Sequence, residues 1–163
     1  MKKKEILLIF LFFSLDQLMK FLMEKALQNG SIEVIGQFFS LKWLENTGAA
    51  WSILENSSLF LIVISLFCLV FLSIFQNSVQ ESTWKFWGVV LLYAGILGNL
   101  VDRICFGYVK DYLSFTFFTY HFPVFNLADV FIVIGAFLFL IAVLKEEYRN
   151  GKNTSIRRRK RTN

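Results

Sequence analysis

The sequence is poor in the residues that build disulfide-linked or metal-binding proteins. Its 163 residues include two cysteines and a single histidine. One histidine and two isolated cysteines do not supply the ligand set of a zinc site. Counted along helices, Cys68 and Cys105 lie at different depths, too far apart for a disulfide. We therefore expect no metal ion, no other cofactor and no disulfide.

Charge and proline are scarce as well, and these absences indicate one class of protein. Only 18% of the residues are charged and one is proline, whereas 56% are hydrophobic and 20 are phenylalanine. A soluble chain of this length cannot bury so much apolar surface. Four apolar runs, 6–22, 59–75, 86–104 and 124–144, are long enough to cross a bilayer. We predict an all-α membrane protein with four transmembrane helices, one integral membrane domain over residues 1–163.

The first apolar run begins like the apolar part of a cleavable signal peptide, because three lysines precede it. Asp16, Gln17 and Lys20 interrupt the run, and no small-residue cleavage site follows it. We therefore predict that it stays in the protein as the first transmembrane helix.

Basic residues gather at both ends of the chain and between the second and third runs. Cytoplasmic segments collect Lys and Arg, so both termini are predicted to be cytoplasmic. The formal charge of +5 then reflects topology rather than nucleic-acid binding, and the basic tail at 145–163 is expected to touch anionic lipid headgroups. Of the 17 basic residues, 12 lie on this side: Lys2, Lys3, Lys4, Lys85, Lys145, Arg149, Lys152, Arg157, Arg158, Arg159, Lys160 and Arg161.

Polar residues interrupt three of the four apolar runs at a similar depth. At about 1.5 Å per residue, Asp16, Asn99 and Asp129 lie about 18, 21 and 24 Å from the inner face. An ionisable group at membrane depth costs about 3 kcal/mol or more, so it is by default a candidate for a functional site. The three helices together predict one polar pocket that faces the outer surface.

Spacing places the polar residues of the first and third runs on shared helix faces. Asn99, Asp102 and Arg103 stand at i, i+3 and i+4. Asp16 and Lys20 form an acid-first pair at i and i+4. An alternative stays open for Asp102 and Arg103, which could snorkel to the interface from a helix end.

Asn126 and Asp129 show the same i, i+3 spacing at the start of the fourth run. One interpretation is a further wall of the polar pocket. The other is a helix N-cap after Pro123 with an acid in the first helical turn.

The two loops on the outer side differ in pattern. Residues 30–57 alternate partly between apolar and polar side chains and are bounded by turn formers, which predicts short strands. We therefore expect a small extracytoplasmic β-sheet between the first and second helices. The second outer loop, 106–123, contains Asp111 and the only histidine, His121. Helix counting does not fix the depth of Asp111.

Several carboxylates in one pocket of low dielectric constant favour acid–base chemistry. Two carboxylates a few ångströms apart do not both ionise readily, so one keeps its proton at a raised pKa. The ionised carboxylate can activate water, and the protonated one can hydrogen-bond to the carbonyl under attack. This arrangement hydrolyses a peptide bond without a metal or a covalent intermediate.

Five short segments occur in order over nearly the whole chain. They are Asp16-Gln17 with Lys20, Asn46-Thr47-Gly48-Ala49-Ala50-Trp51-Ser52, Gly98-Asn99 with Asp102-Arg103, Val109-Lys110-Asp111, and Phe125-Asn126-Leu127-Ala128-Asp129. Together they resemble the lipoprotein signal peptidase family, also called signal peptidase II, of aspartyl peptidases in bacterial membranes. Each segment alone is a weak pattern, but five in order on four spans are highly specific. Trp51 is a mild departure, since Phe is common there in such proteins.

The resemblance implies that Asp111 and Asp129 are the catalytic pair, which the residue chemistry alone does not single out. It implies an aspartic endopeptidase whose activated water cleaves prolipoproteins just before a lipobox cysteine that carries a diacylglyceryl group. The residues implied to bind substrate or orient the site are Asn99, Asp102, Arg103, Asn126, Asp16, Lys20 and Asn46.

The resemblance also implies the surroundings of the enzyme. The protein would be a multi-pass protein of the bacterial plasma membrane with its active site at the extracytoplasmic face. Its partners would be the lipidated prolipoprotein, membrane lipids and cyclic peptide inhibitors such as globomycin. A monomer is expected, because nothing in the sequence demands a partner subunit.

Other classes of membrane protein fit less well. A small ion- or proton-translocating subunit also has acids in its spans, yet the inner halves of the last three runs contain almost no ionisable residue. A serine–lysine peptidase would need Ser14 beside Lys20, but six residues separate them, so they do not share a helix face. The Gly-x-Gly-Asp signature of other intramembrane aspartyl peptidases is absent.

Overall fold

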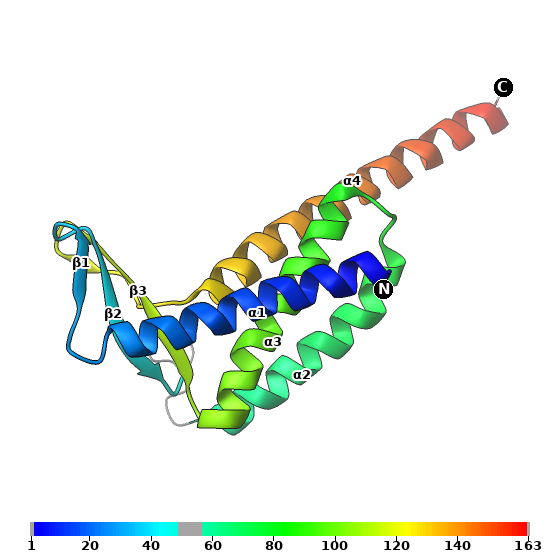
Figure 1. Cartoon of the computed structure of the whole chain (residues 1–163). Coiled ribbons are helices and arrows are strands. Elements are labelled where there is room, and N and C mark those ends of the chain that lie inside the picture. The colour runs from blue at the N-terminus through cyan, green and yellow to red at the C-terminus, as the bar shows by residue number, and fades with distance from the viewer. Residues whose placement is uncertain (1, 49–56, 163) are drawn as a thin grey trace.

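The computed structural model describes residues 2–48 and 57–162, with side chains up to residue 152. Four long helices and a small sheet form this part of the chain (Figure 1). Each of these helices is long and apolar enough to cross a membrane, as predicted. In chain order the elements are α1 (Lys3–Ala26), β1 (Ile32–Ile35), β2 (Phe39–Asn46), α2 (Ser58–Phe75), the short 3-10 helix η2 (Gln76–Ser78), α3 (Thr83–Phe106), β3 (Val109–Phe117), β4 (Tyr120–His121) and α4 (Leu127–Thr162).

Large apolar side chains cover the outward faces of the helices. Phe10 on α1 is 65% exposed, and Phe67 on α2 and Val133 on α4 are each 68% exposed. Soluble monomers rarely expose apolar surface on this scale. The helical surface is therefore suited to contact with lipid tails, in agreement with an integral membrane protein.

Helix α3 is central and packs against α1, α2 and α4. Its closest approach is to α4, where Gly88 and Gly135 lie at the crossing. A Cβ atom on Gly88 would lie 2.7 Å from the backbone nitrogen of Phe139, and one on Gly135 would lie 2.8 Å from that of Leu92. Small residues of this kind let two membrane helices bring their backbones together.

Replacing Gly88 with alanine is expected to destabilise the protein by about 1–3 kcal/mol, since the added methyl group would force the α3 and α4 backbones apart. Thermal unfolding in detergent measures the effect. Gly151→Ala is the matched control, because a Cβ atom there meets nothing within 4 Å. Equal melting temperatures for the two variants would contradict the close crossing.

The helix ends follow from local capping. The Ser82 hydroxyl accepts the Lys85 backbone N–H at 3.1 Å, and Gly107, with φ of 84°, ends α3 in the left-handed conformation. Helix α4 begins at Leu127, three residues after the start of the predicted span 124–144, because Phe125 is extended and bridges to Leu113 of β3. The helix continues to Thr162, so it includes residues of the basic tail that follows the predicted span.

The sheet is larger than the predicted one. Its order is β1-β2-β3-β4, with antiparallel neighbours. The prediction assigned strands to 30–57 only, whereas β3 and β4 come from the second loop, 106–123. The register sets Leu44 opposite Asp111 and Asn46 opposite Val109. Pairing between β2 and β3 therefore brings the two loops together and places Asp111 on a strand beside β2.

The sheet lies across one end of the helical bundle, and both termini lie toward the other end (Figure 1). The C-terminal end of α1, the end of α3 and the start of α4 meet at the sheet (Figure 1). This end of the molecule brings together the polar residues of the helices and Asp111.

Candidate active site

A buried ion-paired cluster joins α1 to α3. Lys20 Nζ lies 2.9 Å from Asp16 Oδ2 and 2.9 Å from Asp102 Oδ2. It also donates a hydrogen bond to Asn99 Oδ1 at 3.0 Å. Asp16 and Asp102 are fully buried, so Asp102 does not snorkel to the interface, and the predicted pair of Asp16 and Lys20 is present. One ammonium group thus lies in contact with two buried carboxylates.

Gln17 and Gly98 complete the contact between α1 and α3, although neither residue was assigned a role from the sequence. Gln17 Nε2 donates to Asp102 Oδ1 at 3.1 Å and to the Gly98 carbonyl at 3.2 Å. A Cβ atom on Gly98 would lie 2.5 Å from Asp16 Oδ2, so any larger residue would collide with the cluster. The one signal that pointed to both residues was their place in the family segments.

Asn126 connects the start of α4 to the rest of the network. Its Oδ1 accepts the Asp129 backbone N–H at 2.9 Å, while Asp129 Oδ2 accepts the Asn126 backbone N–H at 3.1 Å. This reciprocal pair resembles a capping box. The same side chain donates to Asp111 Oδ1 at 2.7 Å and to Asn99 Oδ1 at 3.1 Å. Asn126 is therefore both the N-cap of α4 and a link between polar groups.

Asp111 and Asp129 are thus joined through Asn126, and each accepts one more amide hydrogen bond. Asn46 Nδ2 donates to Asp111 Oδ2 at 2.9 Å. Asn99 Nδ2 donates to Asp129 Oδ1 at 2.7 Å. Asp111 is 1% exposed, whereas Asp129 is half-buried. The network therefore holds one enclosed carboxylate and one that is partly open.

The environment of Asp111 favours its protonated form. Burial and, next, the charge of the neighbouring Asp129 raise the pKa of Asp111 to about 7. The amide hydrogen bonds from Asn46 and Asn126 oppose this rise. A carboxyl that titrates near neutral pH beside a second carboxylate is suited to general acid–base chemistry.

Arg103 borders the site from α3. Its Nη2 donates to the carbonyl of Gly48 at 3.0 Å. Its Nε is buried and has no hydrogen-bond partner among the residues that the structure describes. The following family residues at 49–52, including Trp51, lie outside the described part of the chain.

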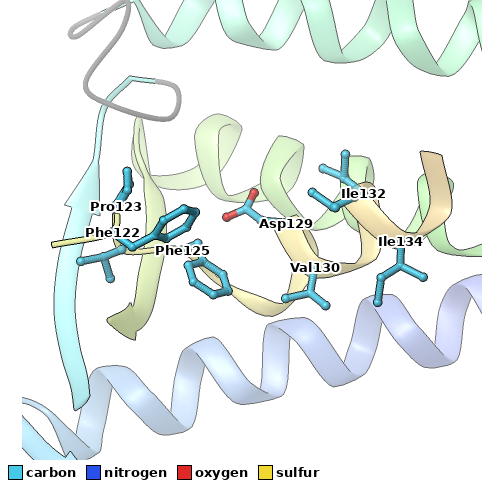
Figure 2. A pocket seen from close by; sticks show the side chains of 9 residues that line it. Phe122, Pro123, Phe125, Asp129, Val130, Ile132 and Ile134 are labelled. Atoms are coloured by element: carbon cyan, nitrogen blue, oxygen red, sulfur yellow. The ribbon is translucent and has the colours of Figure 1, made fainter. Parts of the chain in front are cut away.

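Two mainly apolar cavities open beside Asp129. One, of about 450 Å³, lies between residues 122–125 and the first turns of α4. Figure 2 shows the Asp129 carboxylate pointing toward the side of Phe122 and Pro123, whereas the Val130 and Ile134 side chains point in another direction from α4. The other cavity, of about 640 Å³, lies between α2, α3 and α4, with Asn99, Arg103 and Asp129 among its polar lining residues. The half-buried carboxylate is therefore accessible from two apolar spaces.

The nine residues singled out from the sequence lie within one region at the sheet end of the bundle. Eight are linked by hydrogen bonds or ion pairs, and Arg103 lies beside them. His121 is exposed and hydrogen-bonded with Thr116 at 3.0 Å, apart from this network. The chemical roles assigned to the nine residues stay predictions.

Comparisons with known proteins identify the family. The sequence model described as "Signal peptidase (SPase) II" matches residues 8–145. A lipoprotein signal peptidase of Clostridium tetani (strain Massachusetts / E88) is 39% identical over 147 residues, which cover 88% of this chain and 94% of the relative. One of Staphylococcus aureus (strain bovine RF122 / ET3-1) is 38% identical over 133 residues, which cover 80% and 82%.

Two solved structures agree with this result. A "Bacterial membrane enzyme structure by the in meso method at 2.3 A resolution" has a TM-score of 0.78 and 34% identity, with 88% of this chain and 89% of that chain covered. A second bacterial membrane enzyme, solved at 1.9 Å, has a TM-score of 0.75 and 34% identity, with 87% and 93% covered. The family match, the sequence identity and the shared fold together show that the chain belongs to the signal peptidase II family, the lipoprotein signal peptidases.

Proposed function

We propose that this protein removes signal peptides from prolipoproteins by cleaving just before a lipobox cysteine that carries a diacylglyceryl group. The relatives named lipoprotein signal peptidase support the substrate class. The observation that carries the proposed chemistry is the link between Asp111 and Asp129 through Asn126. This link holds two carboxylates together at the edge of an apolar helical bundle.

The proposed reaction is hydrolysis by an activated water molecule. The ionised carboxylate takes a proton from water as the water oxygen attacks the carbonyl carbon, and the protonated carboxyl gives its proton to the carbonyl oxygen. The resulting gem-diol then returns one hydroxyl proton to the second carboxylate while the first protonates the peptide nitrogen. The carbon–nitrogen bond breaks, and both carboxyl groups regain their starting protonation states.

The remaining site residues are proposed to orient the pair. Asn46, Asn99 and Asn126 each donate to a carboxylate oxygen, which limits the directions in which the carboxylates can turn. Lys20 positions Asn99 by a hydrogen bond and is itself held by the buried acids of α1 and α3. The two apolar cavities at Asp129 are proposed to receive the lipid chains and the apolar part of the signal peptide.

The proposed orientation places the site at the extracytoplasmic face and both termini in the cytoplasm. Two features support it. The sheet that carries Asp111 lies at one end of the bundle and both termini lie toward the other (Figure 1), and 12 of the 17 basic residues are Lys85 or belong to the terminal segments. In this orientation the acyl chains of a substrate stay in the bilayer while its scissile bond reaches the polar site. We further propose that the chain acts as a monomer and that globomycin-type cyclic peptides bind to the same site.

Cleavage of a lipidated substrate tests the function directly. Purified protein in nanodiscs is incubated with a diacylglyceryl-modified prolipoprotein and with the unmodified precursor, and the products are identified by mass spectrometry. We expect cleavage of the modified substrate alone, on the amino side of the modified cysteine. Cleavage of neither would favour the ion-translocating alternative, which the family assignment does not support.

The rate of prolipoprotein cleavage should fall as the pH rises through about 7. The pKa of Asp111 is raised to about 7, so above that value the pair of Asp111 and Asp129 loses its shared proton. The rate falls rather than rises with pH because the proposed reaction requires one protonated carboxyl group. Initial rates between pH 5 and 9, approximately the range over which a group of this pKa titrates, measure the descending limb. A rate that rises steadily through this range would contradict a proton-sharing pair.

Asn46→Ala is expected to move the descending limb of the pH–rate profile to higher pH. The hydrogen bond from Asn46 favours the ionised form of Asp111, so its loss should raise the apparent pKa, by about one unit. The control is Asn77→Ala, which removes an exposed amide near the opposite end of the bundle. A limb that stays in place or moves to lower pH would contradict the assigned contact.

A further inference from the structure

Lys110, the residue before Asp111, is held by contacts to three different partners. Its Nζ lies 2.7 Å from Glu24 Oε2 on α1 and 3.9 Å from the centre of the Phe106 ring at the end of α3. Its backbone N–H donates to Asp102 Oδ2 at 3.2 Å. Lys110 is buried, whereas Glu24 is partly exposed. Both the main chain and the side chain of this residue are therefore fixed.

Glu24 belongs to the same face of α1 as the buried ion-paired cluster. Asp16, Lys20 and Glu24 recur at every fourth position, so they lie above one another on the helix. Lys20 contacts Asp102 of α3, and Glu24 contacts Lys110 of β3. A single charged face of α1 thus positions both the helix and the strand that carry polar site residues.

Strand geometry connects Lys110 to the carboxylate of Asp111. Successive side chains on a strand point to opposite faces, so a fixed Lys110 also fixes the direction of its neighbour. Lys110 contacts α1, while the two carboxylate oxygens of Asp111 meet Asn46 and Asn126. A change at Lys110 would therefore be transmitted through one peptide unit to Asp111.

We infer that Lys110, through its ion pair with Glu24, is a positioning residue that holds the Asp111 carboxylate in its place beside Asp129. The inference rests on the proposed function, in which Asp111 takes part in the reaction. Its role differs from that of a stabilising ion pair, because a displaced carboxylate slows the chemical step without weakening substrate binding. A displacement of about 1 Å can cost about a hundredfold in rate.

The experiment compares kcat and KM for a diacylglyceryl-modified peptide. In Lys110→Met we expect kcat to fall by about ten- to a hundredfold while KM stays within about twofold. Lys110→Arg keeps the cation and should recover most of the loss. Glu24→Gln should also lower kcat, and Glu24→Gln combined with Lys110→Met should be no slower than Lys110→Met alone, since both remove one interaction. Lys42→Met, at an exposed lysine of β2, is the matched control.

Several results would overturn the inference. These are an unchanged kcat in Lys110→Met, a loss that appears mainly in KM, or no recovery in Lys110→Arg. If Lys110→Met does not fold, Glu24→Gln decides: a lower kcat at an unchanged melting temperature supports the inference, and an unchanged kcat rejects it. Asp111→Asn is assayed in parallel, because full activity of that variant would reject the proposed function itself, whatever the Lys110 variants show.

Discussion

Asparagine in place of Asp111 or of Asp129 is expected to abolish measurable cleavage of a lipidated prolipoprotein, a loss of about 10³-fold or more. Asparagine keeps the shape of the side chain but can neither accept a proton from water nor return one. Each replacement therefore removes one half of the proposed acid–base pair. Initial rates with purified, membrane-reconstituted protein measure the loss, and thermal unfolding shows whether the variant remains folded.

Glu147→Gln is the matched control for these two variants, since it neutralises an exposed carboxylate on the same helix as Asp129, near the opposite end of the bundle. It should retain the full rate. Full turnover by a folded Asp129→Asn variant would contradict the assignment of the pair. Asp102→Asn should instead lower thermal stability, and a loss of activity at unchanged stability would assign Asp102 to the chemistry.

Lys20→Met is expected to lower the free energy of unfolding by about 3–5 kcal/mol, which makes it the largest single effect on stability. Lys20 is the cation between Asp16 and Asp102, and all three side chains are buried. Removing the ammonium group leaves two buried carboxylates close together without a compensating charge. Thermal unfolding in detergent, together with the yield of folded protein, measures the effect.

Combining Lys20→Met with Asp16→Asn and Asp102→Asn should recover part of the lost stability, because no buried charge then remains unpaired. Lys3→Met, at an exposed lysine in the first turn of α1, should leave the melting temperature nearly unchanged. If the combined variant were less stable than Lys20→Met alone, the cost would not arise from unpaired charge, and the account of the cluster would be wrong.

The parts of the fold that could be predicted are those in which local spacing has one structural meaning. Apolar runs long enough to cross a bilayer determined the four helices. The i, i+4 spacing of Asp16 and Lys20 determined their ion pair, since residues four apart on a helix are neighbours. Asn126 could be predicted as a cap for the same reason, because capping involves only the next three residues.

Contacts between distant segments were decided by the tertiary structure alone. The third partner of the Lys20 cluster, Asp102, comes from another helix, and its identity depends on how α1 and α3 pack. The family resemblance indicated that Asp111 matters, but helix counting could not place it, because it lies on a strand. Its position follows from the pairing of β2 with β3, which joins loops far apart in the sequence.

The sequence by itself therefore determined that this protein is a four-helix membrane protein of the signal peptidase II type with acids at one depth. Hydrophobic length and helical period are local properties, and they are readable without a fold. The tertiary structure alone decided which amide binds which carboxylate and that Lys110, on the strand of Asp111, pairs with Glu24 of α1. These contacts depend on strand register and helix packing, which arise only when the whole chain has folded.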